Sequence, residues 1–196
     1  LAEDQKKMML EQVNHDADRV TRLITELLDI SRLELGRLVL RRQLVDLKAV
    51  AVMVVEKVSM DQPDLDAAVD FDDDVPKGYA DPDKVEQVLT NLVENACKYA
   101  TPLDMRIVGR AFEDHVSVSV TDRGEGIPAA ALPQVFRKFL RRDLSKPRGT
   151  GLGLWISRGV VEAHGGGLPA TSSVGEGTTL PFTVPTLDLP ADTGGR

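Results

Sequence analysis

The chain has 196 residues, of which 42% are hydrophobic and 28% are charged. A chain of this length and composition can bury one hydrophobic core of good size, which excludes an intrinsically disordered protein. Its net charge of −7 argues against nucleic acid or an anionic membrane surface as a general partner.

The sequence carries no sign of export or of a membrane span. No run approaches 18 apolar residues and no signal peptide opens the chain. The single cysteine, Cys97, cannot form an internal disulfide, which suits a reducing compartment. We therefore expect a cytoplasmic piece without direct membrane contact. Because it begins at Leu1 without a Met, we expect it to be a fragment, which leaves open a membrane anchor in a preceding part.

Residues 2 to about 36 have the pattern of one long helix that ends at Gly36, a residue suited to the left-handed position after a helix. Spacings of three and four alternate along it and form a heptad seam: Leu10, Val13, Ala17, Val20, Ile24, Leu27 and Ser31. Such a helix cannot bury its seam against itself, so it needs a partner helix from the same chain, from another subunit, or from both.

His15 precedes an acidic residue, Asp16, within this helix. A phosphoaccepting histidine with a neighbouring base can look like this. A single histidine on a long polar-faced helix is more often solvated, so we interpret His15 as a surface residue.

The next elements are a short extended link over 38–46 and a helix over 47–58 capped by Asp46. Val69 and Phe71 alternate with acidic residues and predict an edge strand. The acidic run DFDDD resembles a metal cluster, but consecutive carboxylates on such a strand are more often a solvated edge.

A second long helix is predicted to start at Asp81-Pro82, because Asp81 can accept from the first free amides and Pro82 has its φ preset. Asn91, Asn95 and Lys98 share one stripe of this helix and border its apolar stripe. The apolar stripe consists of Val85, Val88, Leu89, Leu92, Val93 and Ala96.

Strands are predicted over 105–112 and 116–121, and the strict alternation of the second is typical of a half-buried antiparallel strand. Three glycine clusters follow, at 122–128, 149–154 and 175–178. The middle cluster directly precedes an apolar helix, so its backbone amides can approach a phosphate chain at the helix N-terminus.

Together these segments resemble one family. NLVENACKY from Asn91, DRGEGIP, VFRKFLRRD, GTGLGLWI and GEGT match in order and spacing the N, G1, F, G2 and G3 boxes of sensor histidine kinases. The ATP-binding domain of that family shares a superfamily with gyrase and the mismatch-repair ATPase. Upstream, ELLDISRLELGRLVL resembles the end of the second helix of the family's dimerisation and phosphotransfer domain.

The resemblance implies a Bergerat-type α/β sandwich, with a mixed sheet covered by helices on one face and the nucleotide under a mobile lid. It divides the chain into a partial dimerisation and phosphotransfer helix over 1–38 and an ATP-binding catalytic domain over 39–186. The tail over 187–196 is rich in Pro, Asp and Gly, so we expect it to be disordered.

It also implies roles for individual residues. Asn95, with Asn91, resembles the ligand of Mg²⁺, since an amide oxygen is a hard neutral donor. Lys98 and Tyr99 would meet the phosphates, and Asp122 would accept from the exocyclic amine of adenine. The full ATP-binding set implied is Asn91, Asn95, Lys98, Tyr99, Asp122, Gly124, Gly126, Ile127, Arg141, Gly149, Thr150, Gly151, Leu152, Gly153, Leu154 and Thr178.

The lid implied by the family lies between Ile127 and Gly149 and is strongly basic. Either a solvated basic surface or phosphate contact explains this charge, and we favour phosphate contact or docking of the lid. Phe136 and Phe139 are expected to anchor the lid to the core. The basic residues are Arg137, Lys138, Arg141, Arg142, Lys146 and Arg148.

Hydrolysis of ATP is disfavoured, because relatives that hydrolyse it have a Glu four residues before the metal-binding Asn, where this chain has Asn91. The family's phosphoaccepting motif, His-Glu-x-x-Thr-Pro, is absent from these residues, so we assign no catalytic residue. The γ-phosphoryl is expected to go to a histidine outside this chain and then to the receiver domain of a response regulator. The full-length protein is expected to dimerise through the N-terminal helix.

Two other functions remain open, a protein serine kinase of the anti-sigma type and a nucleotide-binding regulatory module without phosphotransfer. The sequence departs from the family at Pro169 and Pro181, which fall in the last two expected strands. Because proline cannot donate to a strand ladder, we expect these strands to be edges, short or bulged, within a sheet that survives.

Overall fold

The structure is a computed structural model that describes residues 3–100, 103–139 and 150–187. The chain divides into two compact units, Leu1–Leu38 and Val39–Arg196. Of the predicted tail over 187–196, only residue 187 is among the described residues.

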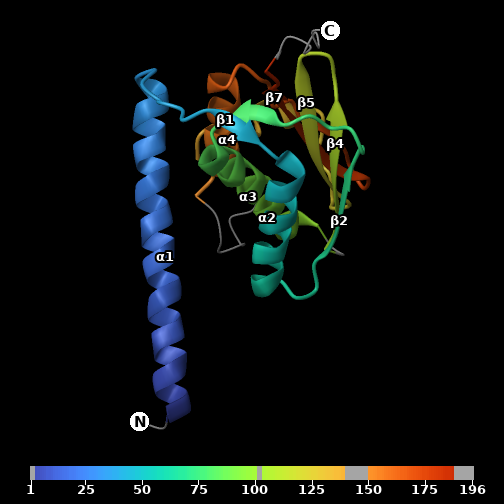
Figure 1. The fold of residues 1–196 in the computed structure, drawn as a ribbon. Coiled ribbons are helices and arrows are strands. Elements are labelled where there is room, and N and C mark those ends of the chain that lie inside the picture. The colour runs from blue at the N-terminus through green and yellow to red at the C-terminus, as the bar shows by residue number, and fades with distance from the viewer. Residues whose placement is uncertain (1–2, 101–102, 140–149, 188–196) are drawn as a thin grey trace, which may run out of the picture. The chain divides into compact units, whose positions relative to one another are not determined.

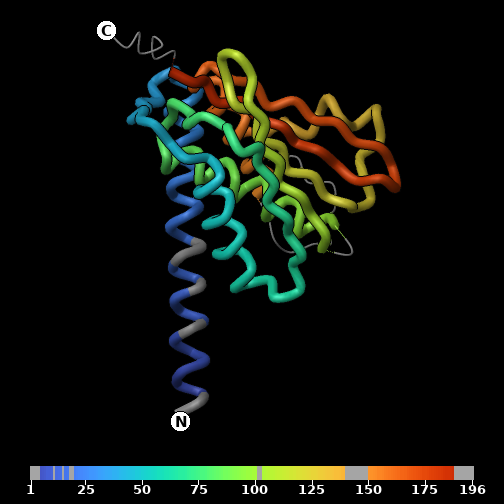
Figure 2. The backbone as a smooth tube through the Cα atoms, turned by 45° about the vertical axis from the view of Figure 1, so that its right-hand side comes forward, coloured from blue at the N-terminus to red at the C-terminus, as the bar shows by residue number. Residues whose placement is uncertain are grey.

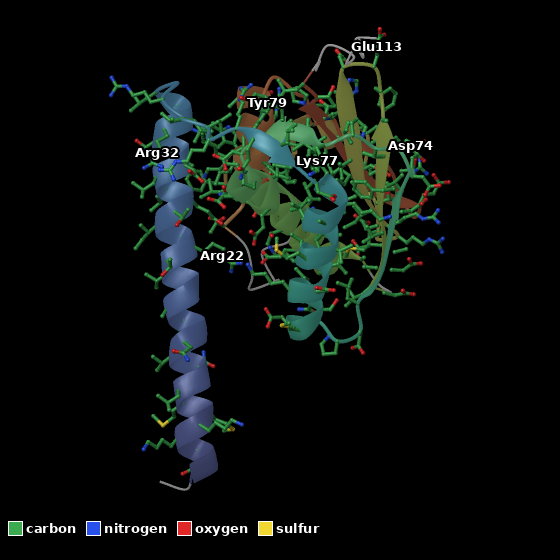
Figure 3. The ribbon with its side chains drawn as sticks, viewed as in Figure 1. Arg22, Arg32, Asp74, Lys77, Tyr79 and Glu113 are labelled. Carbon is green, nitrogen blue, oxygen red and sulfur yellow. The ribbon has the colours of Figure 1, made fainter. Side chains whose placement is uncertain are left out.

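The first unit is the helix α1 (Glu3–Glu34), which confirms the predicted long helix. Arg32 lies in its last turn (Figure 3), and Gly36 follows with a φ of +62°. No helix formed by the described residues is both long and apolar enough to cross a membrane. Several residues of the predicted seam are more than half exposed: Leu10, Val13, Val20, Ile24 and Leu27.

The second unit alternates strands and helices. In chain order its elements are β1 (Gln43–Val45), α2 (Leu47–Asp61), β2 (Asp66–Phe71), β3 (Gly78–Ala80), α3 (Pro82–Tyr99), β4 (Asp104–Ala111), β5 (His115–Asp122), the 3-10 helix η1 (Leu132–Gln134), α4 (Gly153–Ala163), β6 (Thr171–Ser173) and β7 (Gly177–Pro185).

The five-stranded sheet has the order β2-β4-β5-β7-β6. β2 pairs with β4 in parallel and the other pairs are antiparallel, while β1 and β3 form a separate two-stranded ribbon. The helices α2, α3 and α4 lie on one face of the large sheet (Figure 1). This two-layer arrangement with a mixed sheet confirms the predicted fold class.

The start of α3 is the one predicted from Asp81 and Pro82. The Asp81 carboxylate accepts from the amides of Asp83 (3.1 Å) and Lys84 (3.3 Å), and Pro82 occupies the first turn. The predicted apolar stripe is buried, with Leu89 and Leu92 fully so. Burial of each such leucine contributes about 2 kcal/mol, so the core fixes how α3 is rotated about its axis.

The alternation predicted for β5 is confirmed, since Val116, Val118 and Val120 are buried and the residues between them are half-buried. β4 and β5 are joined by a tight turn that carries Glu113 (Figure 3). Figure 2 shows β5 and β7 running side by side, as their pairing requires.

The prediction for the two prolines was correct for one strand and wrong for the other. Pro169 precedes β6, which is short and at the edge of the sheet. Pro181 lies inside β7, which has nine residues and two neighbouring strands. The Thr183 amide points away from β5 and donates to Gly167 O (3.1 Å), so position 181, two residues earlier, faces the same way. β6 pairs only with residues 177–179 of β7, so the proline at 181 removes no hydrogen bond between these two strands.

A buried histidine joins the start of α3 to the end of α4. His164 is 3% exposed; its Nδ1 lies 2.8 Å from Val160 O and its Nε2 accepts from the Asp81 amide (3.0 Å). These two bonds require the neutral imidazole with its proton on Nδ1. Burial lowers the pKa of His164, helped by the nearby Arg42 guanidinium and opposed by the bond to Val160 and the charge of Asp81.

We therefore expect acidification to destabilise the protein through His164. Below its ordinary pKa of 6.5 the unfolded chain takes up a proton that the folded protein does not, so the free energy of unfolding falls as the pH falls. Urea unfolding between about pH 7.5 and about pH 5.5 measures this slope. His164→Gln, which can still donate and accept but does not titrate, is expected to have a smaller slope; equal slopes would contradict the assignment.

Candidate functional site

The polar stripe of α3 lies at the border of the core, as predicted. Asn91, Asn95, Lys98 and Tyr99 are all half-buried. The Lys98 ammonium lies 4.0 Å from Glu94 Oε2, one helical turn earlier. The stripe thus offers amide oxygens and a cation along one edge of the helix.

Asp122 is a buried carboxylate at the end of β5. It is 6% exposed and pairs in register with Met105 of β4 and Thr178 of β7. The Gly124 amide donates to its Oδ1 (2.8 Å). Burial raises the pKa of Asp122, while backbone hydrogen bonds from Gly124 and Thr178 act in the opposite direction. A carboxylate has about four acceptor positions, so it can still accept from a ligand.

Two positions in the segment after Asp122, 124 and 126, are packed too tightly for a side chain. A Cβ at Gly124 would collide with the Tyr99 carbonyl, at the end of α3. Gly126 has a φ of +69°, and a Cβ there would run into the Ser173 carbonyl of β6. The structure therefore brings the predicted residues Tyr99, Asp122, Gly124 and Gly126 together.

The N-cap residue of α4 offers no side-chain hydrogen bond to the first amides of the helix. Gly153 and Leu154 begin the helix, and Leu152 stands at the cap position without a side-chain hydrogen bond. The Leu152 amide donates to Thr150 Oγ1 (3.3 Å), and Gly151 has a φ of +71°. The first amides of a helix have no partner within the helix, and together with the helix dipole they make this end suitable for an anion.

The helices α3 and α4 meet at Asn91. Its side-chain nitrogen donates to Gly153 O (3.3 Å) and to Ser157 Oγ (3.2 Å). The predicted amide stripe and the predicted glycine cluster are therefore adjacent.

Two predicted residues, Arg141 and Gly149, lie outside the described residues. Of the predicted basic segment, Lys138 places its ammonium 4.3 Å from the ring centroid of Trp155 on α4. Phe136 is half-buried, and the Cζ atom of Arg158 lies 5.5 Å from the centroid of its ring. The expectation for Phe139 was wrong: it is 68% exposed, so it does not anchor to the core.

Sequence analysis missed two serines. Ser172 Oγ accepts from the Ile127 amide (2.8 Å) and lies 2.9 Å from Thr178 Oγ1, so it ties the glycine loop to β6 and β7. Ser157 is completely buried against Asn91. Ser157 follows Gly153 by four residues, a spacing that could have drawn attention to it; no pattern marks Ser172.

The domain has a mixed sheet with helices on one face and a buried acid at a strand end. A polar stripe on α3 lies beside the glycine-rich N-terminus of α4. This combination defines a Bergerat-type ATPase domain. Residues 80–191 match the family model described as histidine kinase-, DNA gyrase B-, and HSP90-like ATPase. The chain belongs to this family.

Its curated relatives include the sensor protein SrrB of Staphylococcus aureus strain N315. The two are 32% identical over 187 residues, which cover 93% of this chain and 32% of SrrB. The chain thus spans about a third of the length of the curated relatives it matches.

Solved structures show the same fold. Full-length ShkA in complex with AMPPNP has a TM-score of 0.78 at 24% identity, covering 92% of this chain and 38% of that one. The mycobacterial sensor histidine kinase MprB has a TM-score of 0.65 at 26% identity, covering 74% and 97%. The Acinetobacter baumannii histidine kinase AdeS has a TM-score of 0.73 at 24% identity, covering 94% and 85%.

Gly126→Ala is expected to destabilise the protein by about 2 kcal/mol or more, because the left-handed φ and the collision with the Ser173 carbonyl both oppose a Cβ. Urea unfolding measures the loss. Gly167→Ala is the matched control, since a Cβ at Gly167 meets nothing within 4 Å and its φ is not left-handed. Equal stability of the two variants would show that the loop is not held as described.

Proposed function

We propose that residues 39–186 are the ATP-binding catalytic domain of a sensor histidine kinase, and that 1–38 are part of its dimerisation and phosphotransfer helix. Asp122 carries the proposal: a buried carboxylate with acceptor capacity remaining, at a strand end where Gly124 and Gly126 exclude side chains. Such a group can accept from the exocyclic amine of adenine, whereas guanine would face it with a carbonyl oxygen.

The phosphates would extend from this point toward α4. Lys98 and Tyr99 lie on α3 with Asn91 and Asn95, and the first backbone amides of α4, at Gly153 and Leu154, suit an anion. Support for ATP as the ligand comes from ShkA, which has this fold and was solved with AMPPNP. Arg141 and Gly149 complete the proposed phosphate site from outside the described residues.

Mg²⁺ would be held by Asn91 and Asn95 through their side-chain oxygens. The donor set fits the ion, because Mg²⁺ takes hard oxygen ligands and keeps waters and phosphate oxygens in most of its positions. When bound, the ion offsets the negative charge of the β- and γ-phosphates. Asn91 cannot accept a proton, so the chain is not equipped at this position to activate water for hydrolysis.

The γ-phosphoryl would then go to a histidine on a phosphotransfer helix that these 196 residues do not provide, and from there to a response regulator's receiver aspartate. We place this process in the cytoplasm, in a homodimer formed through α1, with any membrane anchor in a preceding part of the protein.

A calorimetric titration tests the nucleotide site. A non-hydrolysable ATP analogue with Mg²⁺ is expected to bind, the GTP analogue is expected to bind much more weakly, and Asp122→Asn is expected to lose roughly 10- to 100-fold in affinity for the ATP analogue, as expected for a hydrogen bond to a charged group. Asp70→Asn is the matched control, because Asp70 is a surface carboxylate on β2 paired with Arg110.

Failure of the folded native chain to bind the ATP analogue would contradict the proposal. Equal affinities of Asp122→Asn and Asp70→Asn would contradict the role of Asp122 in reading adenine.

A further inference from the structure

The orientation of the Asn91 side chain is fixed by α4. A primary amide has two N–H groups, and those of Asn91 donate to Gly153 O (3.3 Å) and Ser157 Oγ (3.2 Å). Gly153 O can only accept, so the bond to it fixes which end of the amide is the nitrogen. The oxygen Oδ1 takes part in neither of these bonds and lies beside Gly153, where a Cβ would be 3.5 Å from it.

Ser157 is placed to hold this orientation rather than to meet a ligand itself. Its side chain is 0% exposed, so no nucleotide or ion reaches it. It follows Gly153 by four residues, so both acceptors lie one above the other on the face of α4 that meets α3. Burying a hydroxyl costs free energy unless it is hydrogen-bonded, so the bond from Asn91 also stabilises Ser157 in its buried position.

We propose that Ser157 is a positioning residue for the metal site: by taking one amide hydrogen of Asn91, it keeps Oδ1 available to Mg²⁺. This inference rests on the proposed function, in which Asn91 and Asn95 hold the ion. A reversed amide would present its N–H groups to the cation, and these repel it. Ser157 thus favours binding of the metal without touching metal or nucleotide.

Without the Ser157 hydroxyl, we expect Mg²⁺ to tighten nucleotide binding less, while nucleotide affinity in the absence of Mg²⁺ stays the same. The measured quantity is the factor by which Mg²⁺ tightens binding of a non-hydrolysable ATP analogue, taken from Kd values with and without the ion. In Ser157→Ala the bond to Gly153 O remains, so we expect this factor to fall only roughly three- to tenfold, with the Mg²⁺-free Kd unchanged.

Further variants distinguish the effect of losing the Ser157 hydroxyl from the effect of changing the packing around it. Ser157→Cys has nearly the shape of serine but is a weak acceptor, so it is expected to behave like Ser157→Ala. Ser157→Thr keeps the hydroxyl and is expected to restore the factor. Ser59→Ala is the matched control, because Ser59 Oγ donates to Val55 O within α2, away from this site. Thermal unfolding shows that each variant is folded.

A second readout needs neither metal nor nucleotide. The side-chain amide protons of Asn91, assigned by their loss in Asn91→Ala, are expected to exchange slowly with solvent in the native protein and faster in Ser157→Ala, as followed by NMR. Unchanged exchange would overturn the inference.

The Mg²⁺ factors of these variants distinguish failure of the role of Ser157 from failure of the proposed metal site. If Asn91→Ala lowers the Mg²⁺ factor but Ser157→Ala does not, the metal site stands and the role of Ser157 is overturned. If Ser157→Ala weakens binding equally with and without Mg²⁺, Ser157 acts through general packing and the inference is likewise overturned. If neither Asn91→Ala nor Asn95→Ala changes the factor, the proposed metal site fails and the inference fails with it.

Discussion

Burial of the apolar stripe of α3 is the interaction on which the site depends. Leu89, Leu92 and Val93 are completely buried, and together they fix how the helix is rotated about its axis. Because successive residues are about 100° apart, that rotation holds Asn91 and Asn95 at the border of the core. A shift by one residue would bury amides and expose leucines, at a cost of several kcal/mol. The same packing that stabilises the domain therefore positions its proposed metal ligands.

The rest of the site is built from parts that have little freedom to move. Asp122 ends a strand paired on both sides, and the loop after it is packed against Tyr99 and Ser173 so closely that only glycine fits at 124 and 126. A ligand without a donor would leave this buried acceptor unpaired, which favours selectivity for a hydrogen-bond donor. Its raised pKa reflects the cost of keeping this acceptor away from water.

Much of this could be predicted from the sequence, because the relevant signals are local. The cap at Asp81, the stripe of α3 and the alternation in β5 each depend on a few neighbouring residues. The errors arose where distant segments decide the outcome. Pro181 is tolerated inside β7 because β6 ends before it, and the bond between Ser157 and Asn91 joins residues far apart in the chain. Such pairings depend on tertiary contacts that periodicity does not encode.

Phosphoryl transfer to a histidine is the decisive measurement for the kinase assignment. The chain would be mixed with ATP labelled at the γ-phosphate and with a separately prepared phosphotransfer hairpin from a related sensor kinase. We expect acid-labile label on the hairpin's histidine, formed only when both proteins are present. A folded chain that binds ATP but leaves the hairpin unlabelled would contradict the kinase assignment and favour a regulatory module, while acid-stable label on a serine would indicate a serine kinase.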